Sequence, residues 1–150
     1  ADSSEAAAMR GKVARWAARE GMTALANSIA DSLLAPARRS EPELRATITR
    51  MAEAQGIVRF TAHQQALATR PDQRADLPRL ACPVLVITGT EDMTTPLSAG
   101  LALVAAVPQG RCIPLPGVGH MAVLEAPDQV APLVAAFLTE ITTTTKEDAQ

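Results

Sequence analysis

Aromatic residues and concentrated positive charge are scarce in this 150-residue chain. Aromatics make up 2% of the residues, with one Trp, two Phe and no Tyr, so the side chains on which unpaired bases stack are nearly absent. The formal net charge is -2 at pH 7, and the arginines are scattered among acidic residues instead of forming a basic stripe. These two absences argue against a nucleic-acid partner.

Long apolar runs are also lacking. No stretch approaches the roughly 20 apolar residues that a membrane-spanning helix needs. The N-terminal segment ADSSEAAAMRGK contains no apolar core of a signal peptide. The sequence therefore predicts a soluble, cytoplasmic protein with no membrane partner.

Cysteine is scarce as well, with only Cys82 and Cys112 in the chain. Two cysteines are too few for a secreted disulfide scaffold, and these two lie too far apart for a zinc knuckle. We therefore expect reduced, buried thiols. The sequence leads us to expect no metal ion and no other cofactor.

Apolar residues are abundant, at 47% of the chain, and consist largely of Ala, Leu and Val. A self-contained fold of this length buries roughly 68–70% of its unfolded surface. Two parts differ in pattern: residues 1–76 predict one helix after another, whereas residues 77–140 predict alternating strands and helices. Residues 141–150 form a polar, aperiodic tail that we expect to be frayed or disordered.

Residues 1–76 carry apolar side chains at helical spacing. Met9, Val13 and Trp16 recur at i, i+4 and i+7, which marks one face of an amphipathic helix. The segment Ser40-Glu-Pro-Glu43 has the form of a capping box at a helix start. Gly56 suits the left-handed position that follows a helix end. Together these signals predict a cluster of four short amphipathic helices.

Residues 77–140 predict a β-α-β-α order. The run PVLVIT, residues 83–88, is apolar and β-branched, as in a parallel strand covered on both faces. Thr95-Pro96 predicts an N-cap and a first helical position for a helix to Val107. A second strand at 111–115 and a last helix at 127–138 complete the pattern. Two such strands leave at least one apolar sheet edge unpaired, so we expect something to cover it.

Two loops follow the predicted strands at their C-terminal ends, where open α/β sheets gather functional groups. The first, GTEDMTTP, carries Asp92, and the second, GVGH, carries His120. Neighbouring parallel strands bring the loops side by side, so Asp92 could accept a hydrogen bond from the imidazole and orient it as a base. Gly117 and Gly119 are expected to allow backbone angles closed to other residues.

Each residue taken alone has a simpler interpretation. A lone histidine after glycine is more often a turn or surface residue, and an aspartate after a strand often only caps the next helix. The matching positions of Asp92 and His120 after adjacent strands favour the catalytic interpretation.

A family resemblance rests on CPVLVITGTEDMTTPLSAGLALVAAVPQGRCIPLPGVGHMAVLEAPDQVAPLVAAFL. This segment resembles the C-terminal end of an α/β-hydrolase, with its strand-Gly-x-x-Asp loop, Gly-His loop, Glu-x-Pro and closing Phe-Leu. The resemblance covers residues 77–140. Residues 15–80 are more loosely similar to the helical caps of 3-oxoadipate enol-lactonases, related esterases and cofactor-free haloperoxidases.

The resemblance implies a fold class and residue roles. The fold is α/β: a partial α/β-hydrolase with a helical cap, residues 1–76, and the last two parallel strands with their helices, residues 77–140. Asp92 becomes the triad acid and His120 the base. Glu125 matches a family position whose expected role is structural, tying down the last helix near Pro127. His63 matches nothing catalytic and is expected to be solvated or packed.

The nucleophile is missing from the pattern. The α/β-hydrolase nucleophile lies on a Gly-x-Ser-x-Gly elbow between a strand and a helix. No serine here has the flanking glycines and the preceding apolar strand; the serines are Ser3, Ser4, Ser28, Ser32, Ser40 and Ser98. We therefore expect the chain to be the C-terminal portion of a hydrolase about twice as long, with its N-terminal sheet half and nucleophile elsewhere.

The resemblance implies hydrolysis of a carboxylic ester or lactone in the complete enzyme, and no activity for the 150 residues alone. An aspartate nucleophile would instead give a dehalogenase or an epoxide hydrolase. A third hypothesis is a non-catalytic module that associates through its strand edge. The expected partners are a small-molecule ester or lactone and either a second copy of the chain or the missing N-terminal half.

Overall fold

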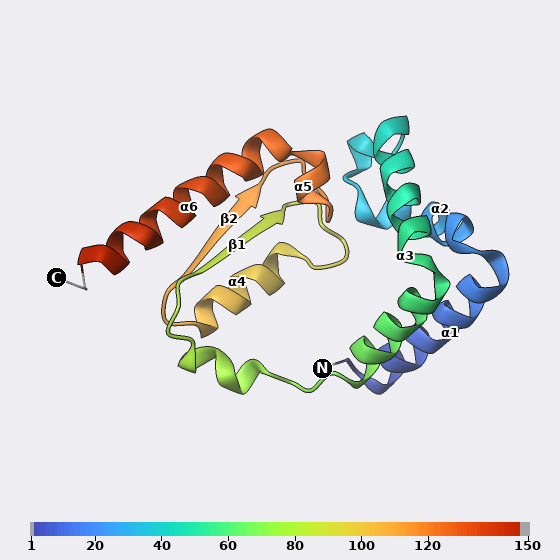
Figure 1. Ribbon diagram of the computed structural model, residues 1–150, viewed down its shortest axis with the longest axis horizontal. Coiled ribbons are helices and arrows are strands. Elements are labelled where there is room, and N and C mark those ends of the chain that lie inside the picture. Colours follow the sequence, from blue (N-terminus) through green and yellow to red (C-terminus); the bar gives the residue numbers. More distant parts are fainter. Residues whose placement is uncertain (1, 148–150) are drawn as a thin grey trace. The chain divides into compact units, whose positions relative to one another are not determined.

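The computed structural model describes residues 2–147, which form helices and one small parallel sheet (Figure 1). The elements in chain order are α1 (Ser4–Glu20), α2 (Met22–Leu33), the 3-10 helix η1 (Pro36–Arg38), α3 (Pro42–Thr69), the 3-10 helix η2 (Arg74–Arg79), β1 (Val84–Gly89), α4 (Leu97–Ala106), β2 (Gly110–Leu115), α5 (Ala122–Glu125) and α6 (Pro127–Glu147). The α/β fold class predicted from the sequence is confirmed by the parallel sheet and the helices around it.

The chain divides into two compact units. The helical unit comprises residues up to 31 and residues 39–75, and the sheet unit comprises residues 32–38 and the chain from 76 onward. Residues 32–38, which we call the connector, thus group with the sheet unit although they lie inside the predicted cap.

Glycines end or bend the helices of the helical unit. α1 ends at Gly21, with a φ of 88°, and α3 bends at Gly56, with a φ of 69°. Both angles lie in the region that favours glycine, so the predicted break at Gly56 is present. The core of this unit consists of Ala17, Leu25 and Phe60, with Trp16 among the half-buried residues around them.

The predicted capping box at Ser40 is wrong by one position. α3 begins at Pro42, its N-cap is Glu41, and no side chain makes a cap hydrogen bond there. Proline at the first helical position lacks an N–H and has its φ already fixed near the helical value, so this start depends less on a cap than most do.

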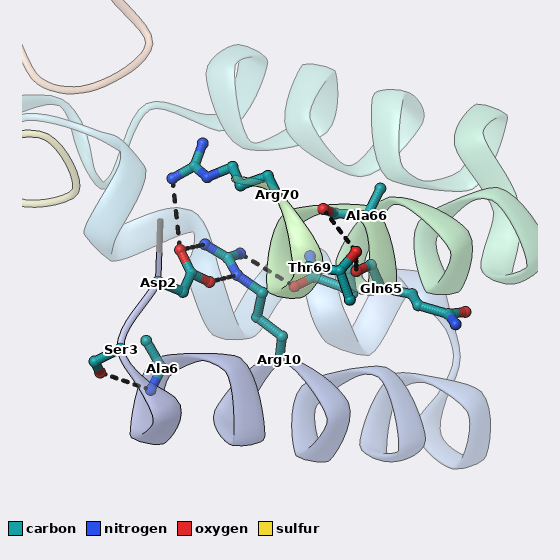
Figure 2. Close-up of polar contacts among 9 residues, drawn as sticks. Asp2, Ser3, Ala6, Arg10, Gln65, Ala66, Thr69 and Arg70 are labelled. Atoms are coloured by element: carbon teal, nitrogen blue, oxygen red, sulfur yellow. Dashed lines mark hydrogen bonds and ion pairs between the residues drawn. The ribbon is translucent and has the colours of Figure 1, made fainter. Parts of the chain in front are cut away.

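An ionic cluster joins the N-terminal segment to the end of α3 (Figure 2). Asp2 pairs with the Arg10 guanidinium and lies 3.5 Å from Arg70 Nη2. The hydrogen bond from Arg10 holds the pKa of the Asp2 carboxyl below its usual value. Arg10 also reaches Gln64 on α3 at 3.4 Å, so one charged group links α1 to α3.

The sheet is parallel, with β1 beside β2 and Val86 opposite Cys112. α4 and α6 flank it on opposite faces (Figure 1). Gly100 of α4 is so close to the sheet that an added Cβ would lie 3.2 Å from Val86 Cγ1. On the other face the core consists of Leu115, Val118, Ala126 and Val130, with Ile87, Ile113, Ala122 and Leu133 packed against it.

Several element limits differ from the sequence prediction. α4 begins at Leu97 with Pro96 at the N-cap, so Thr95 is not the cap. The short helix α5 was not predicted. α6 continues past the predicted end at residue 138 to Glu147, so the tail is helical as far as it is described; residues 148–150 lie outside the described residues. Cys82 is exposed and Cys112 half-buried, which contradicts the expectation of buried thiols.

Within the described residues the sheet consists of two strands, so β1 carries one unpaired edge. β1 is only half-buried over its first four residues, although its sequence is that of a strand covered on both faces. Among residues 2–147 no helix combines the length and the apolar character needed to cross a membrane.

Candidate active site

The loops that follow β1 and β2 are bonded to one another. We call residues 90–96 the aspartate loop and residues 116–121 the histidine loop. The Thr90 N–H donates to the Leu115 carbonyl at 3.0 Å, and the Glu91 N–H donates to the Val118 carbonyl at 2.9 Å. The Gly117 N–H donates to Thr90 Oγ1 at 3.1 Å. The parallel register therefore places the two loops side by side at one edge of the sheet.

Glycines make this close approach possible for two different reasons. Gly117 has a φ of 70°, as predicted, so it supplies the left-handed conformation of the turn. A Cβ on Gly89 would lie 2.0 Å from the Val118 carbonyl oxygen, so its role is to leave space. Gly119 also leaves space: its φ is not positive, and a Cβ there would lie 2.4 Å from Ala35 N. The prediction of unusual backbone angles at Gly119 is therefore wrong.

The structure brings Asp92 and His120 together, as the spacing predicts. His120 Nδ1 lies 2.9 Å from Asp92 Oδ2. The Asp92 side chain is 5% exposed, whereas the His120 side chain is 31% exposed. A buried carboxylate thus holds one ring nitrogen of an imidazole that solvent still reaches.

Four donors face the two Asp92 oxygens. Oδ1 accepts the N–H groups of Thr94 and Thr95, both at 2.8 Å, and Oδ2 accepts the Thr95 hydroxyl at 2.7 Å in addition to His120 Nδ1. Burial raises the pKa of the Asp92 carboxyl, but these hydrogen bonds, led by that of the Thr95 N–H, outweigh burial and leave the pKa below its usual value. Asp92 is therefore ionised at neutral pH.

Thr95 is the residue of the site that the sequence prediction missed. Its hydroxyl lies 2.7 Å from Asp92 Oδ2 and 3.3 Å from His120 Nδ1, so it touches both members of the pair. The Thr-Pro pattern predicts a helix cap, so the sequence analysis assigned the Thr95 side chain to the start of the next helix and not to the site. The spacing could have identified Thr95: it follows Asp92 by three positions, and Asp side chains often form hydrogen bonds with backbone and hydroxyl groups that close in sequence.

A cleft of 320 Å³ adjoins the pair, and its lining includes Thr88, Leu103 and His120. Because Asp92 occupies Nδ1, Nε2 is the ring nitrogen left to take a proton from a third group. A larger cavity of 510 Å³ lies at the opposite ends of the strands, but its charged residues, Arg111 and Glu140, pair with one another at 3.0 Å. The side chain that could act as a base, His120, therefore lies at the smaller cleft.

Glu125 and His63 form hydrogen bonds with groups other than the Asp92–His120 pair. Glu125, in α5, is 3% exposed, and its carboxylate accepts the N–H groups of Ala35 at 2.9 Å and Gly119 at 3.1 Å. It therefore ties the connector to the histidine loop, and not the last helix as expected from the sequence. His63 is exposed on α3, and its Nδ1 lies 2.8 Å from Gln55 Nε2.

The described serines do not form a strand-to-helix elbow. Ser3 and Ser4 stand at the start of α1, Ser28 and Ser32 lie within α2, Ser40 precedes α3 and Ser98 lies within α4. Clusters of three or more His, Cys, Asp or Glu side chains that could hold a metal ion do not occur among residues 2–147.

Known proteins resemble the chain over most of its length. The profile of the Alpha/beta hydrolase family matches residues 3–133. A thermophilic esterase from Thermogutta terrifontis superposes with a TM-score of 0.87 at 30% identity, covering 93% of this chain and 52% of the esterase. The enol-lactonase from Burkholderia xenovorans LB400 superposes with a TM-score of 0.76 at 27% identity, covering 85% of this chain and 49% of the lactonase.

A curated relative matches a shorter part. The putative non-heme bromoperoxidase BpoC of Mycobacterium tuberculosis is 34% identical over 62 residues, which are 41% of this chain and 24% of that protein. The chain thus spans about a quarter of this curated relative and about half of each of the two solved structures.

Proposed function

The chain belongs to the alpha/beta hydrolase family, and from this premise we propose that it supplies the acid, Asp92, and the base, His120, of a hydrolase for carboxylic esters or lactones. The observation that carries the proposal is the 2.9 Å contact between His120 Nδ1 and the buried, ionised Asp92. In this proposal residues 1–76 are the cap and residues 77–140 part of the catalytic core. A cytoplasmic location also remains a prediction.

The proposed chemistry begins at His120 Nε2. A serine supplied by another part of the complete enzyme gives its proton to Nε2 while its oxygen attacks the carbonyl carbon of the substrate. Asp92 stabilises the imidazolium that forms, because its carboxylate already accepts the Nδ1 proton. The imidazolium then protonates the leaving oxygen, and water activated by the same imidazole hydrolyses the acyl-enzyme.

The substrate class is supported by the activities of two similar proteins of known structure, an esterase and an enol-lactonase. Both cleave a carbon–oxygen bond at an acyl group, for which a histidine base and a buried acid are suited. The serine would come from the half that such enzymes have and this chain does not span. We therefore propose that the 150 residues alone are inactive.

His120→Ala in the complete protein tests the role of the base. Turnover of an activated ester should fall by about 10⁴-fold or more, because the nucleophile would keep its proton. His63→Ala is the matched control, since it removes the other histidine from an exposed position on α3 and should leave turnover unchanged. Near-normal turnover in a folded His120→Ala variant would remove His120 from the mechanism.

A second candidate is a non-catalytic module that associates through the sheet edge. The observation that favours it is the half-buried, apolar β1 with its unpaired edge in the described residues. Light scattering of the purified chain tests this candidate, because a stable monomer at high concentration would contradict association through this edge.

A further inference from the structure

Three consecutive backbone N–H groups of the histidine loop are held by groups outside that loop. The Gly119 N–H donates to Glu125 Oε1 at 3.1 Å. The N–H groups of His120 and Met121 both donate to the carbonyl oxygen of Leu33, at 2.9 and 3.2 Å. Leu33 lies in the connector, so the backbone that carries the imidazole is bonded to a segment far away in sequence.

Glu125 joins the same two segments through its side chain. Oε2 accepts the Ala35 N–H of the connector at 2.9 Å, while Oε1 accepts the Gly119 N–H of the histidine loop. The Glu125 backbone carbonyl accepts a hydrogen bond from the Arg38 guanidinium, also in the connector. One buried residue therefore bridges both segments and is itself held in place.

The bridge requires a carboxylate. Both partners are N–H donors, and the two carboxylate oxygens are both acceptors. A glutamine would offer one acceptor and one NH₂ group, so a donor would face a donor in a buried position, at a substantial cost in free energy. The packing at the bridge is also tight, since a Cβ on Gly119 would lie 2.8 Å from Glu125 Oε1.

We infer that Glu125 is a positioning residue for the proposed base: by holding the connector against the histidine loop, it fixes where the His120 imidazole stands relative to Asp92. The inference rests on the function proposed above. Glu125 acts through the backbone of Gly119 and His120, because its carboxylate bonds to amides and not to the reacting groups.

Glu125→Gln in the complete protein tests the inference by NMR, without a substrate. The 150 residues contain two histidines, so His120→Ala and His63→Ala variants of the complete protein identify the ring signals of each by difference, and exposed His63 serves as an internal reference. In Glu125→Gln the downfield Nδ1 proton signal of His120 should move upfield or broaden, because its hydrogen bond to Asp92 is no longer held in place. The His63 signals should not change.

Glu140→Gln is the matched control, since it makes the same substitution at an exposed carboxylate on α6. It should leave the signals of both histidines unchanged. In kinetics with an activated ester, Glu125→Gln should lower kcat by about 10- to 100-fold, because small displacements of a catalytic group cost that much. KM should stay within about twofold, because the carboxylate makes no substrate contact.

An unchanged His120 signal in a folded Glu125→Gln variant overturns the inference. If the variant does not fold, amide exchange of the unaltered protein decides. Slow exchange of both Ala35 and Gly119 supports the bridge, and fast exchange of either one within a protected unit overturns it. A shifted His120 signal in an enzyme without ester or lactone turnover supports the inference while it contradicts the proposed function.

Discussion

At the scale of single residues, Asp92 keeps its charge in a buried position because four donors face its oxygens. These donors lower its folded-state pKa below its usual value, so the ionised carboxylate stabilises the fold. This contribution is present above the unfolded pKa of about 3.9 and is lost as the pH falls through the lower folded value. We therefore expect the Asp92 carboxylate to stabilise the fold at neutral pH and to lose this contribution in acid.

Asp92→Asn should remove this pH dependence. The free energy of unfolding of the unaltered protein should exceed that of Asp92→Asn at pH 7, and the difference should shrink as the pH falls below about 4, where the carboxylate of the unfolded chain is already protonated. Urea denaturation from neutral to acid pH measures both curves. A difference that stays constant over this range would show that the charge of Asp92 does not stabilise the fold.

Thr95→Val should destabilise the protein by roughly 1.5–3 kcal/mol, because it removes a hydroxyl donor from a buried carboxylate at nearly constant volume. Thr95→Ser keeps the hydroxyl and should cost less. Thr94→Val is the matched control: its hydroxyl is exposed and donates to the Ser32 carbonyl at 3.3 Å, so its loss should cost under about 1 kcal/mol. Denaturation at pH 7 compares them, and equal costs for Thr94→Val and Thr95→Val would contradict the assigned role.

The sequence could predict Asp92 and His120 because both follow strands whose apolar patterns are plain, and parallel pairing brings the strand ends together. It could not predict the hydrogen bond from the Thr95 hydroxyl to Asp92 or the partners of Glu125. Local rules assign a Thr before Pro to a helix cap, whereas in the fold its hydroxyl bonds to the carboxylate. The partners of Glu125 lie in the connector, and no local pattern connects positions so far apart.

At the scale of elements, the histidine loop depends on glycine in two ways that substitution can separate. Gly119→Ala should destabilise the sheet unit by about 1–3 kcal/mol, because the new methyl group would lie against the Ala35 backbone. Gly117→Ala should cost about 1–2 kcal/mol through its positive φ alone, since a Cβ there meets nothing within 4 Å.

The two variants should also differ in their effect on the connector, because only position 119 lies against it. Only Gly119→Ala should speed amide exchange at Ala35, because only this variant forces the connector away from the loop. Exchange measured by NMR on both variants checks this difference. Equal exchange at Ala35 in the two variants would mean that the loop can shift without the connector.

Element ends were harder to predict than elements. Residues 141–150 were predicted to fray because they are polar and aperiodic and lie at the end of the chain. In α6 the hydroxyls of Thr139, Thr142 and Thr143 instead donate to carbonyls one turn earlier, at 2.9, 3.0 and 2.9 Å. Such bonds satisfy the polar side chains within the helix, so composition alone misjudged where α6 ends.

At the scale of the whole molecule, the chain has about half the length of the two solved structures that it resembles, and its sheet has two strands in the described residues. Large apolar side chains are exposed on both flanking helices, among them Leu101 on α4 and Val134 on α6. Exposed apolar area of this kind is expected to associate, since each Å² removed from water contributes about 25 cal/mol.

The purified 150-residue chain should therefore form dimers or larger species as its concentration rises. Leu101→Lys combined with Val134→Lys should raise the monomer fraction, because burying the two charges in a contact would cost more than the contact gains. Val58→Lys is the matched control: Val58 is 81% exposed on α3, outside the sheet unit, and its replacement should leave association unchanged. Sedimentation velocity over a concentration series measures all three chains. If Val58→Lys raised the monomer fraction as much as the double variant, association would run through the helical unit, and the apolar flanks of the sheet would not be the contact surface.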